Sequence, residues 1–101
     1  MLREIRQKII NGDFELSKHA VDQSIVRNIR IREITEMIVN SEIIEDYPDD
    51  KYGASCLICG FTLANRALHL HCSYPSRRIL KIITLYQPTE ERWQNNFTTR
   101  R

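Results

Sequence analysis

Residues 55–86 read SCLICGFTLANRALHLHCSYPSRRILKIITLY, and this stretch decides the fold. Apolar and polar residues alternate with a period of two in three segments, which predicts strands at 55–63, 67–74 and 79–86. The connections between them are only three and four residues long. Connections this short join antiparallel neighbours, so the stretch predicts an antiparallel meander.

The chain before this stretch has a different period. Apolar residues recur every three or four positions over most of the first 40 residues, which predicts three helices. The first ends before Asn11-Gly12-Asp13, the second takes Ser17 as its N-cap, and the third ends near Asn40. A period of two begins at residues 42–47 and predicts a further strand. Together these elements predict an α+β domain, with the N-terminal helices on one face of an antiparallel sheet of about four strands.

Length and composition fit a single domain that spans residues 1–101. Hydrophobic residues make up 42% of the chain and charged residues 28%, the balance of an ordinary globular protein. No apolar run approaches the roughly 20 residues of a membrane-spanning helix, and the charged N-terminus is unlike an export signal, so we expect a cytoplasmic protein. The three cysteines are then expected to be free thiols. The sequence has no Gly-rich phosphate loop, and we expect no cofactor.

The charges are unevenly distributed along the chain. Residues 42–50 carry five acidic side chains and no basic one, whereas residues 77–101 carry six basic side chains, Arg77 and Arg78 among them, against two acidic ones. The basic end of the chain predicts a surface for a polyanion such as RNA. The alternative is a solvated surface with a frayed basic tail.

The two faces of the sheet can be separated by pairing Leu63 with Leu68 across the first short connection. This register places Cys59 and Cys72 together on the core face. The opposite face is polar, and a slip by one residue would exchange the two. Its side chains could bind an anionic backbone, although they could also be ordinary exposed strand residues: His69, His71, Lys81, Thr84 and Tyr86.

A second candidate feature is the stripe formed by His19, Gln23 and Arg27 in the second helix. A spacing of four places the three side chains on one helix face. Histidine titrates near neutral pH and the arginine fork matches phosphate, so the pair could combine proton transfer with stabilisation of a charged phosphorus centre. Such a stripe is also common on the solvent side of an amphipathic helix.

Zinc binding is a less favoured alternative. Cys56, Cys59 and Cys72, with a histidine, superficially offer a tetrahedral set of ligands. In an extended strand, however, the side chains of Cys56 and Cys59 point to opposite sides, so only one could join a site. We therefore expect Cys59 and Cys72 to be small buried side chains and expect no metal.

Short motifs follow one another in a recognisable order along nearly the whole chain: Ser17-Lys18-His19-Ala20, Arg27, Ile29, Glu33-Ile34, Glu42-Ile43-Ile44-Glu45-Asp46-Tyr47-Pro48, Gly60, Leu68-His69, Ile82-Ile83-Thr84-Leu85-Tyr86, Pro88 and Trp93. This order resembles a bacterial family grouped with the RelE, barnase and EndoU-like ribonucleases. It is similar in pattern to the BrnT toxins and is often encoded beside a YgiT-type zinc-finger protein. The resemblance implies a RelE-like fold, metal-independent RNA cleavage, and neutralisation by a small antitoxin that carries the zinc.

The resemblance also places individual residues. His19 and Arg27 fall on the family's helix histidine and arginine, and Thr84 and Tyr86 fall on its closing strand motif. Gln23 departs from the pattern, because members often have a basic residue there, and this puts the strength of RNA binding in question. Membership of such a superfamily does not by itself establish catalysis.

These observations lead to one hypothesis and one rival. In the hypothesis, the chain is the toxin of a type II toxin–antitoxin system, an endoribonuclease in which a 2′-hydroxyl attacks the adjacent phosphate. His19 serves as general acid or base, Arg27 and Lys81 stabilise the charge, and Tyr86 or His71 supplies the second group. The other contacts to RNA are assigned to His69, Thr84, Arg77 and Arg78. The rival is a non-catalytic module that binds RNA or protein.

Overall fold

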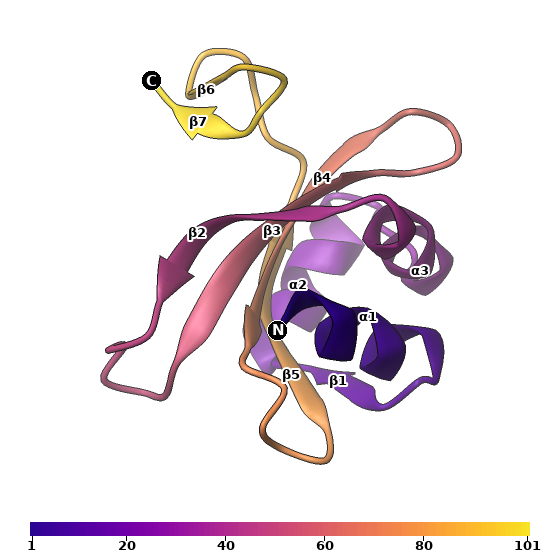
Figure 1. Ribbon diagram of the computed structural model, residues 1–101. Coiled ribbons are helices and arrows are strands. Elements are labelled where there is room, and N and C mark those ends of the chain that lie inside the picture. Colours follow the sequence, from indigo (N-terminus) through magenta and orange to yellow (C-terminus); the bar gives the residue numbers. More distant parts are fainter.

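The computed structural model describes residues 1–101 and is an α+β arrangement of three helices packed on a five-stranded sheet (Figure 1). The elements follow the predicted order, with helices before the main strands. None of the helices is long and apolar enough to cross a bilayer. Their bounds are α1 Leu2–Ile10, β1 Phe14–Leu16, α2 Lys18–Val26, α3 Ile31–Val39, β2 Glu42–Tyr47, β3 Ser55–Phe61, β4 Ala67–Ser73, β5 Leu80–Tyr86, β6 Trp93–Gln94 and β7 Thr99–Arg100.

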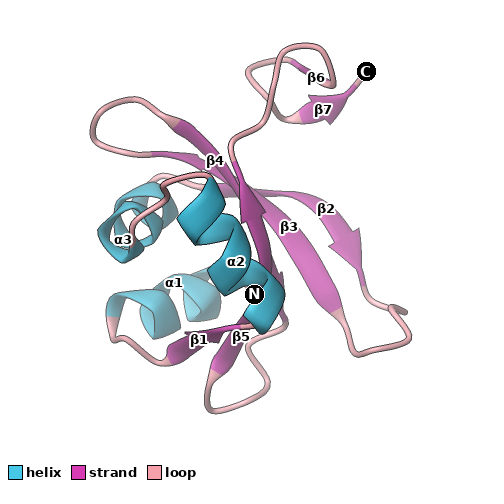
Figure 2. Ribbon diagram, turned by 180° about the vertical axis from the view of Figure 1, so that it is seen from behind, coloured by secondary structure: helices cyan, strands magenta, loops and turns pink.

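The sheet has the strand order β1-β5-β4-β3-β2. Strands β2 to β5 form the predicted antiparallel meander. Strand β1 adds a fifth strand that runs parallel to β5, which the sequence analysis did not predict because β1 has only three residues. A separate hairpin of β6 and β7 follows β5, and Figure 2 shows it beyond the end of the main sheet. The α+β prediction is therefore confirmed, with one edge strand and one hairpin added.

The predicted pairing of Leu63 with Leu68 is wrong. Leu68 lies opposite Gly60, and Cys72 lies opposite Cys56. Strand β3 ends at Phe61 because the next residues form a turn, in which the backbone N–H of Thr62 donates to the carbonyl of Arg66 at 2.9 Å and Asn65 adopts a φ of 64°. The register differs from the predicted one by an odd number of residues, so the two faces of β3 are exchanged.

The exchange changes which β3 residues meet the helices. Cys56 and Ile58 belong to the core, whereas Leu57 and Cys59 pair with the histidines of β4 on the opposite face. The pairing of Cys59 with Cys72 is accordingly replaced by that of Cys56 with Cys72. The polarity of the β3 side chains could not distinguish the two registers, because β3 is buried on both faces from its first residue to Gly60.

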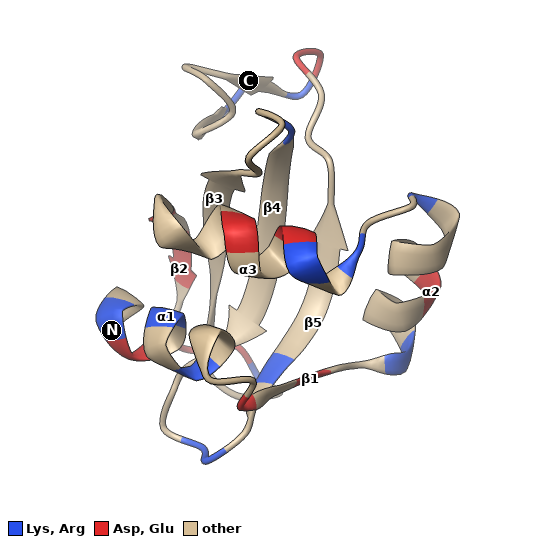
Figure 3. Ribbon diagram, turned by 90° about the vertical axis from the view of Figure 1, so that its right-hand side faces the viewer, with Lys and Arg blue, Asp and Glu red and all other residues tan.

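The faces of β4 and β5 are as predicted. Leu68, Leu70 and Cys72 point to the helices, and the histidines between them point away. Thr84 and Tyr86 lie directly opposite His71 and His69 on that second face. We call this the open face, since α1 and α3 cover the other one. Figure 3 shows α1 and α3 in front of the sheet, with charges of both signs interspersed along them.

Helix α2 closes the edge of β5 beyond the point where β1 ends. Ser17 is its N-cap, as predicted, and accepts a hydrogen bond from the N–H of Ala20 at 3.0 Å. The same hydroxyl donates to the carbonyl of Ile83 at 2.8 Å, and the side-chain oxygen of Gln23 accepts from the N–H of Leu85 at 3.2 Å. Gln23 thus satisfies a backbone group at the edge of the sheet, a task for which an amide acceptor is suited and a basic side chain is not.

Helix α3 approaches β3 closely because residue 60 has no side chain. A Cβ atom at Gly60 would lie 2.2 Å from the carbonyl oxygen of Met37 in α3. That oxygen belongs to the helix backbone and cannot rotate away. The only relief is to move α3 as a whole, with its buried residues Ile34 and Ile38.

We predict that Gly60→Ala lowers the free energy of unfolding by about 3 kcal/mol, the upper range for overpacking a core. Gly12→Ala is the matched control, because Gly12 has a φ of +80° but a methyl group there would meet no atom within 4 Å. Backbone strain alone should cost that variant about 1 kcal/mol. Urea denaturation measures both, and a Gly60→Ala protein as stable as wild type would contradict the close approach.

Candidate functional site

Three hollows of about 370, 330 and 380 Å³ follow one another over the open face. The first and the middle hollow share Asp50 and His71. The middle and the third share Tyr86 and Arg100. Neighbouring hollows thus share lining residues, and we call the row of three the open-face groove.

The groove brings together six of the nine residues that the sequence analysis selected. Arg77 and Lys81 line the first hollow, His71 and Thr84 the middle one, and Arg27 the third. The sixth, Tyr86, lies between the middle and third hollows. Side chains from the C-cap of α2, from β4 and β5 and from the loop between these two strands therefore line one row of hollows.

The other three selected residues lie outside the groove. His19 is exposed on the first turn of α2 and lines none of the three hollows. Arg78 is exposed, and its carbonyl accepts a hydrogen bond from Lys8 Nζ at 2.8 Å. His69 is fully buried. A molecule in the groove therefore has direct access to one histidine, His71.

His71 is oriented by two groups that the sequence analysis did not select. Its Nε2 atom lies 2.9 Å from the hydroxyl of Ser55, and that hydroxyl donates to the carboxylate of Asp50 at 3.2 Å. The Ser55 oxygen must then accept from Nε2–H, which leaves Nδ1 of His71 as an unprotonated acceptor. Burial lowers the pKa of His71, against a smaller opposite effect of the nearby Asp50. The imidazole is neutral at pH 7 and has one free lone pair.

His69 supports Tyr86 from behind. Its Nε2 atom is 2.7 Å from the carbonyl oxygen of Phe97 and donates to it, so Nδ1 accepts from the Tyr86 hydroxyl at 3.0 Å. Trp93 packs edge-on against the imidazole, with 4.4 Å between ring centroids. Burial lowers the pKa of His69 and raises the pKa of Tyr86. The expected contact of His69 with RNA does not fit this position, because the ring is enclosed and both its nitrogens are occupied.

The C-terminal hairpin is fastened to the far edge of the sheet by Arg100. Its guanidinium binds both carboxylate oxygens of Glu45 in β2, at 2.7 and 3.0 Å, and lies over the ring of Trp93 at 4.7 Å. Tyr47 also donates to Glu45. The hydrogen bonds from Arg100 hold the pKa of Glu45 below its usual range. The basic end of the chain is therefore a folded hairpin rather than a frayed tail.

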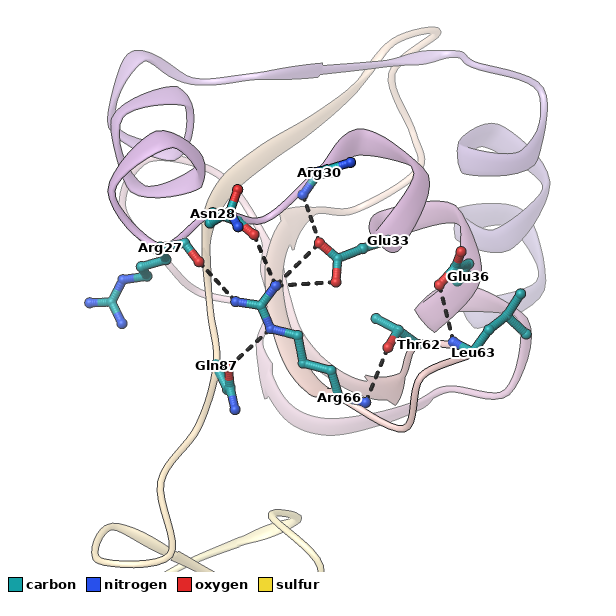
Figure 4. A network of polar contacts seen from close by, with 9 residues as sticks. All are labelled: Arg27, Asn28, Arg30, Glu33, Glu36, Thr62, Leu63, Arg66 and Gln87. Carbon is teal, nitrogen blue, oxygen red and sulfur yellow. Dashed lines mark hydrogen bonds and ion pairs between the residues drawn. The ribbon is translucent and has the colours of Figure 1, made fainter.

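Arg66 holds the backbone of Arg27 at the end of α2 (Figure 4). The Arg66 side chain donates to the carbonyls of Arg27 at 2.8 Å and Asn28 at 3.0 Å, and it forms an ion pair with Glu33 at 3.1 Å. It also donates to the side chain of Gln87 at 3.0 Å. One guanidinium in the β3–β4 loop thus joins the end of α2, the start of α3 and the segment after β5.

The third hollow is rich in arginine. Arg27, Arg92 and Arg100 line it together with Gln87 and Tyr86. Arg100 is committed to Glu45, but the guanidinium groups of Arg27 and Arg92 form no hydrogen bond or ion pair within the protein. Two unpaired arginine forks in one hollow suit an anion such as phosphate.

The cysteines do not gather into a metal site. All three are free and buried, with Cys56 and Cys72 facing each other in the core and Cys59 on the opposite face. No group of three or more His, Cys, Asp and Glu side chains is arranged to hold a metal ion. The opposite orientation of Cys56 and Cys59 agrees with the strand geometry expected from the sequence.

We predict that the free energy of unfolding is smaller at about pH 5.5 than at about pH 7.5, because the pKa values of His69 and His71 are lowered only in the folded chain. Below the ordinary histidine value the unfolded chain takes up protons that the folded chain does not. The stabilisation is therefore present above about pH 6.5 and is lost as the pH falls through the lowered values. Urea denaturation at both pH values measures it. The pH dependence should be weaker in His69→Gln and in His71→Gln, and equal stability at the two pH values would contradict the assignment.

Comparison with known proteins identifies the family but no described activity. The family model described as "Domain of unknown function (DUF4258)" matches residues 16–87, from the end of β1 to just beyond β5. The match includes His71, Thr84 and Tyr86 and ends before the C-terminal hairpin. No curated protein and no solved structure matches the chain. Since the matched part is most of the sequence, the chain belongs to the DUF4258 family.

Proposed function

We propose that the chain is an endoribonuclease that binds RNA along the open-face groove. The observation that carries the proposal is His71, an imidazole with its Nδ1 free and its Nε2 bonded to the Ser55 hydroxyl, which in turn donates to Asp50. His71 lines the first hollow together with Lys81, which also pairs with Glu15 at 3.7 Å, and Arg27 lines the third hollow. A neutral base flanked by cations is the arrangement needed to cleave a polyanion by proton transfer.

In the proposed reaction, His71 Nδ1 takes the proton of a ribose 2′-hydroxyl. The 2′ oxygen attacks the adjacent phosphorus and the bond from phosphorus to the 5′ oxygen breaks. Tyr86, whose burial raises its pKa, turns its hydroxyl hydrogen from Nδ1 of His69 toward the departing 5′ oxygen and gives that oxygen the proton. The products are a 2′,3′-cyclic phosphate and a 5′-hydroxyl, while Arg27 and Lys81 stabilise the charge on the phosphate.

This mechanism assigns the general base to His71 instead of His19, the residue that the family resemblance suggests. His71 lines two of the three hollows, whereas His19 is exposed on α2 and lines none of them. A general base has to come within hydrogen-bonding distance of the proton that it takes. An RNA strand that follows the groove brings its ribose to His71.

The resemblance to RelE-like and BrnT-like toxins supports a role as the toxin of a bacterial type II toxin–antitoxin system in the cytoplasm. The partner would be a small antitoxin of the YgiT zinc-finger type, which would supply the zinc itself. Exposed acidic side chains on and after β2, at Asp46 and Asp49, offer a surface for basic residues of such a partner.

We predict that His71→Ala lowers the rate of RNA cleavage by at least about 100-fold, the usual lower range for loss of a general base. The purified protein is incubated with RNA, and new 5′-hydroxyl ends and cyclic phosphates are measured. Arg3→Ala, on the exposed side of α1, is the control and should cleave at the wild-type rate.

The same assay separates the alternatives. Loss of cleavage in His19→Ala with full activity in His71→Ala would return the catalytic role to His19. RNA binding by folded wild-type protein without any cleavage would identify a non-catalytic binding module. Growth arrest in a bacterial host, relieved by His71→Ala and by the cognate antitoxin, tests the role as a toxin.

We predict that Arg27→Ala weakens binding to RNAs of different sequence by a similar factor, because a phosphate contact carries no sequence information. The slope of log K against log salt concentration should become shallower by about 0.7, the value for one contact to a single strand. Fluorescence anisotropy at several salt concentrations measures the slope. Arg3→Ala removes the same charge outside the groove and should leave the slope unchanged. Equal slopes for Arg27→Ala and wild type would exclude a phosphate contact.

A further inference from the structure

The first hollow differs from the third in its chemistry. Aromatic and aliphatic side chains contribute to its wall, among them Tyr52, Tyr74, Ala54 and Ile83. Ile83 lies beside a β-bulge in β5, where the register shifts opposite the step from His71 to Cys72. Strand alternation points Ile83 away from the core, where its neighbour Ile82 lies, and the bulge lets Thr84 face the same open side. The first hollow thus combines apolar and polar side chains in its lining.

Tyr52 stands at the mouth of this hollow and is 85% exposed. Its backbone is nevertheless held in place. The N–H of Tyr52 donates to Asp50 Oδ1 at 3.2 Å, and the N–H of Gly53, which has a φ of +113°, donates to the carbonyl of Asp50 at 2.9 Å. An exposed aromatic ring on a hydrogen-bonded turn is a suitable platform for stacking a flat ligand.

Polar groups with unused hydrogen-bonding capacity lie beside the apolar surface. The Ser73 hydroxyl oxygen accepts from the N–H of Lys81 at 3.0 Å, so its hydrogen is free to donate to a ligand. The carboxylate of Asp50 only accepts, and Arg77 only donates. Acceptors and donors beside apolar side chains match the edge of a nucleobase, which presents both.

The order of features along the groove also matches the order of groups in a nucleotide. His71 lines both the first and the middle hollow, and the unpaired arginines Arg27 and Arg92 lie beyond it in the third. In a ribonucleotide the 2′-hydroxyl lies between the base and the 3′-phosphate. A ribose at His71 therefore directs its base to the first hollow and its phosphate toward the arginines.

We propose that the first hollow binds a nucleobase, that of the nucleotide whose 2′-hydroxyl meets His71, with the base stacked on Tyr52. The inference rests on the proposed function for its biological substrate, but the binding site itself is independent of cleavage. Asp50 then has two roles, because it contacts the base hollow and also holds Ser55, which orients His71.

The experiment titrates isotope-labelled protein with the four 2′-deoxynucleoside 3′-monophosphates, which have no 2′-hydroxyl and cannot be cleaved, and with inorganic phosphate. At least one nucleotide should shift the amide signals of Tyr52, Ser73 and Lys81. Tyr52→Ala should weaken its binding about tenfold, as expected for loss of one stacking contact, and Tyr52→Phe should restore the affinity. Leu63→Ala, which truncates a side chain that is 88% exposed and outside the groove, is the control.

Two results would overturn the proposal: equal nucleotide affinity in Tyr52→Ala and wild type, or inorganic phosphate producing the same shifts with the same affinity as the nucleotides. The outcome is separate from that of the nuclease assay. Tyr52-dependent nucleotide binding without RNA cleavage would support the base site and reject the nuclease. RNA cleavage that depends on His71, together with nucleotide affinity that Tyr52→Ala leaves unchanged, would support the nuclease and reject the base site.

Discussion

The guanidinium of Arg66 is the contact on which the geometry of the groove depends. It holds the carbonyls of Arg27 and Asn28 at the end of α2 and pairs with Glu33 in α3. Burial alone would raise the pKa of Glu33, but the hydrogen bonds from the Arg30 backbone and from Arg66 keep it below its usual value. The ion pair is therefore stabilising in the folded chain at neutral pH. Because one side chain connects both helices to the β3–β4 turn, the side chain of Arg27 enters the third hollow from a fixed position.

Strand β4 separates the core from the groove. The C-terminal hairpin covers one of its two histidines, and this difference in burial decides the role of each. His69 and His71 point the same way, two residues apart. The C-terminal hairpin encloses His69, which then orients Tyr86, and leaves His71 open to the groove. The difference in their roles therefore comes from a segment more than twenty residues further along the chain.

The groove could be predicted in part from the sequence. Arg27, His71, Lys81, Thr84 and Tyr86 were found because helical and strand periodicities place them on accessible faces. The supporting residues were missed for a physical reason: Ser55 begins a strand buried on both sides, Asp50 lies in a turn-forming acidic run, and Arg100 belongs to a basic end with no periodicity. Nothing local distinguishes a polar residue that orients a histidine from one that meets water.

The sequence by itself determined the element order, the Ser17 N-cap, the α+β class and the outward direction of the β4 histidines, because these follow from side-chain periods and capping chemistry within a few residues. Only the tertiary structure decided the register of β3, the parallel β1 edge and the enclosure of His69. The register of β3 is set by the turn at Asn65, because both faces of β3 are buried and neither fixes the pairing by its polarity. The enclosure of His69 is set by contacts between segments that are distant in the sequence. Both depend on interactions across the fold, which no local pattern contains.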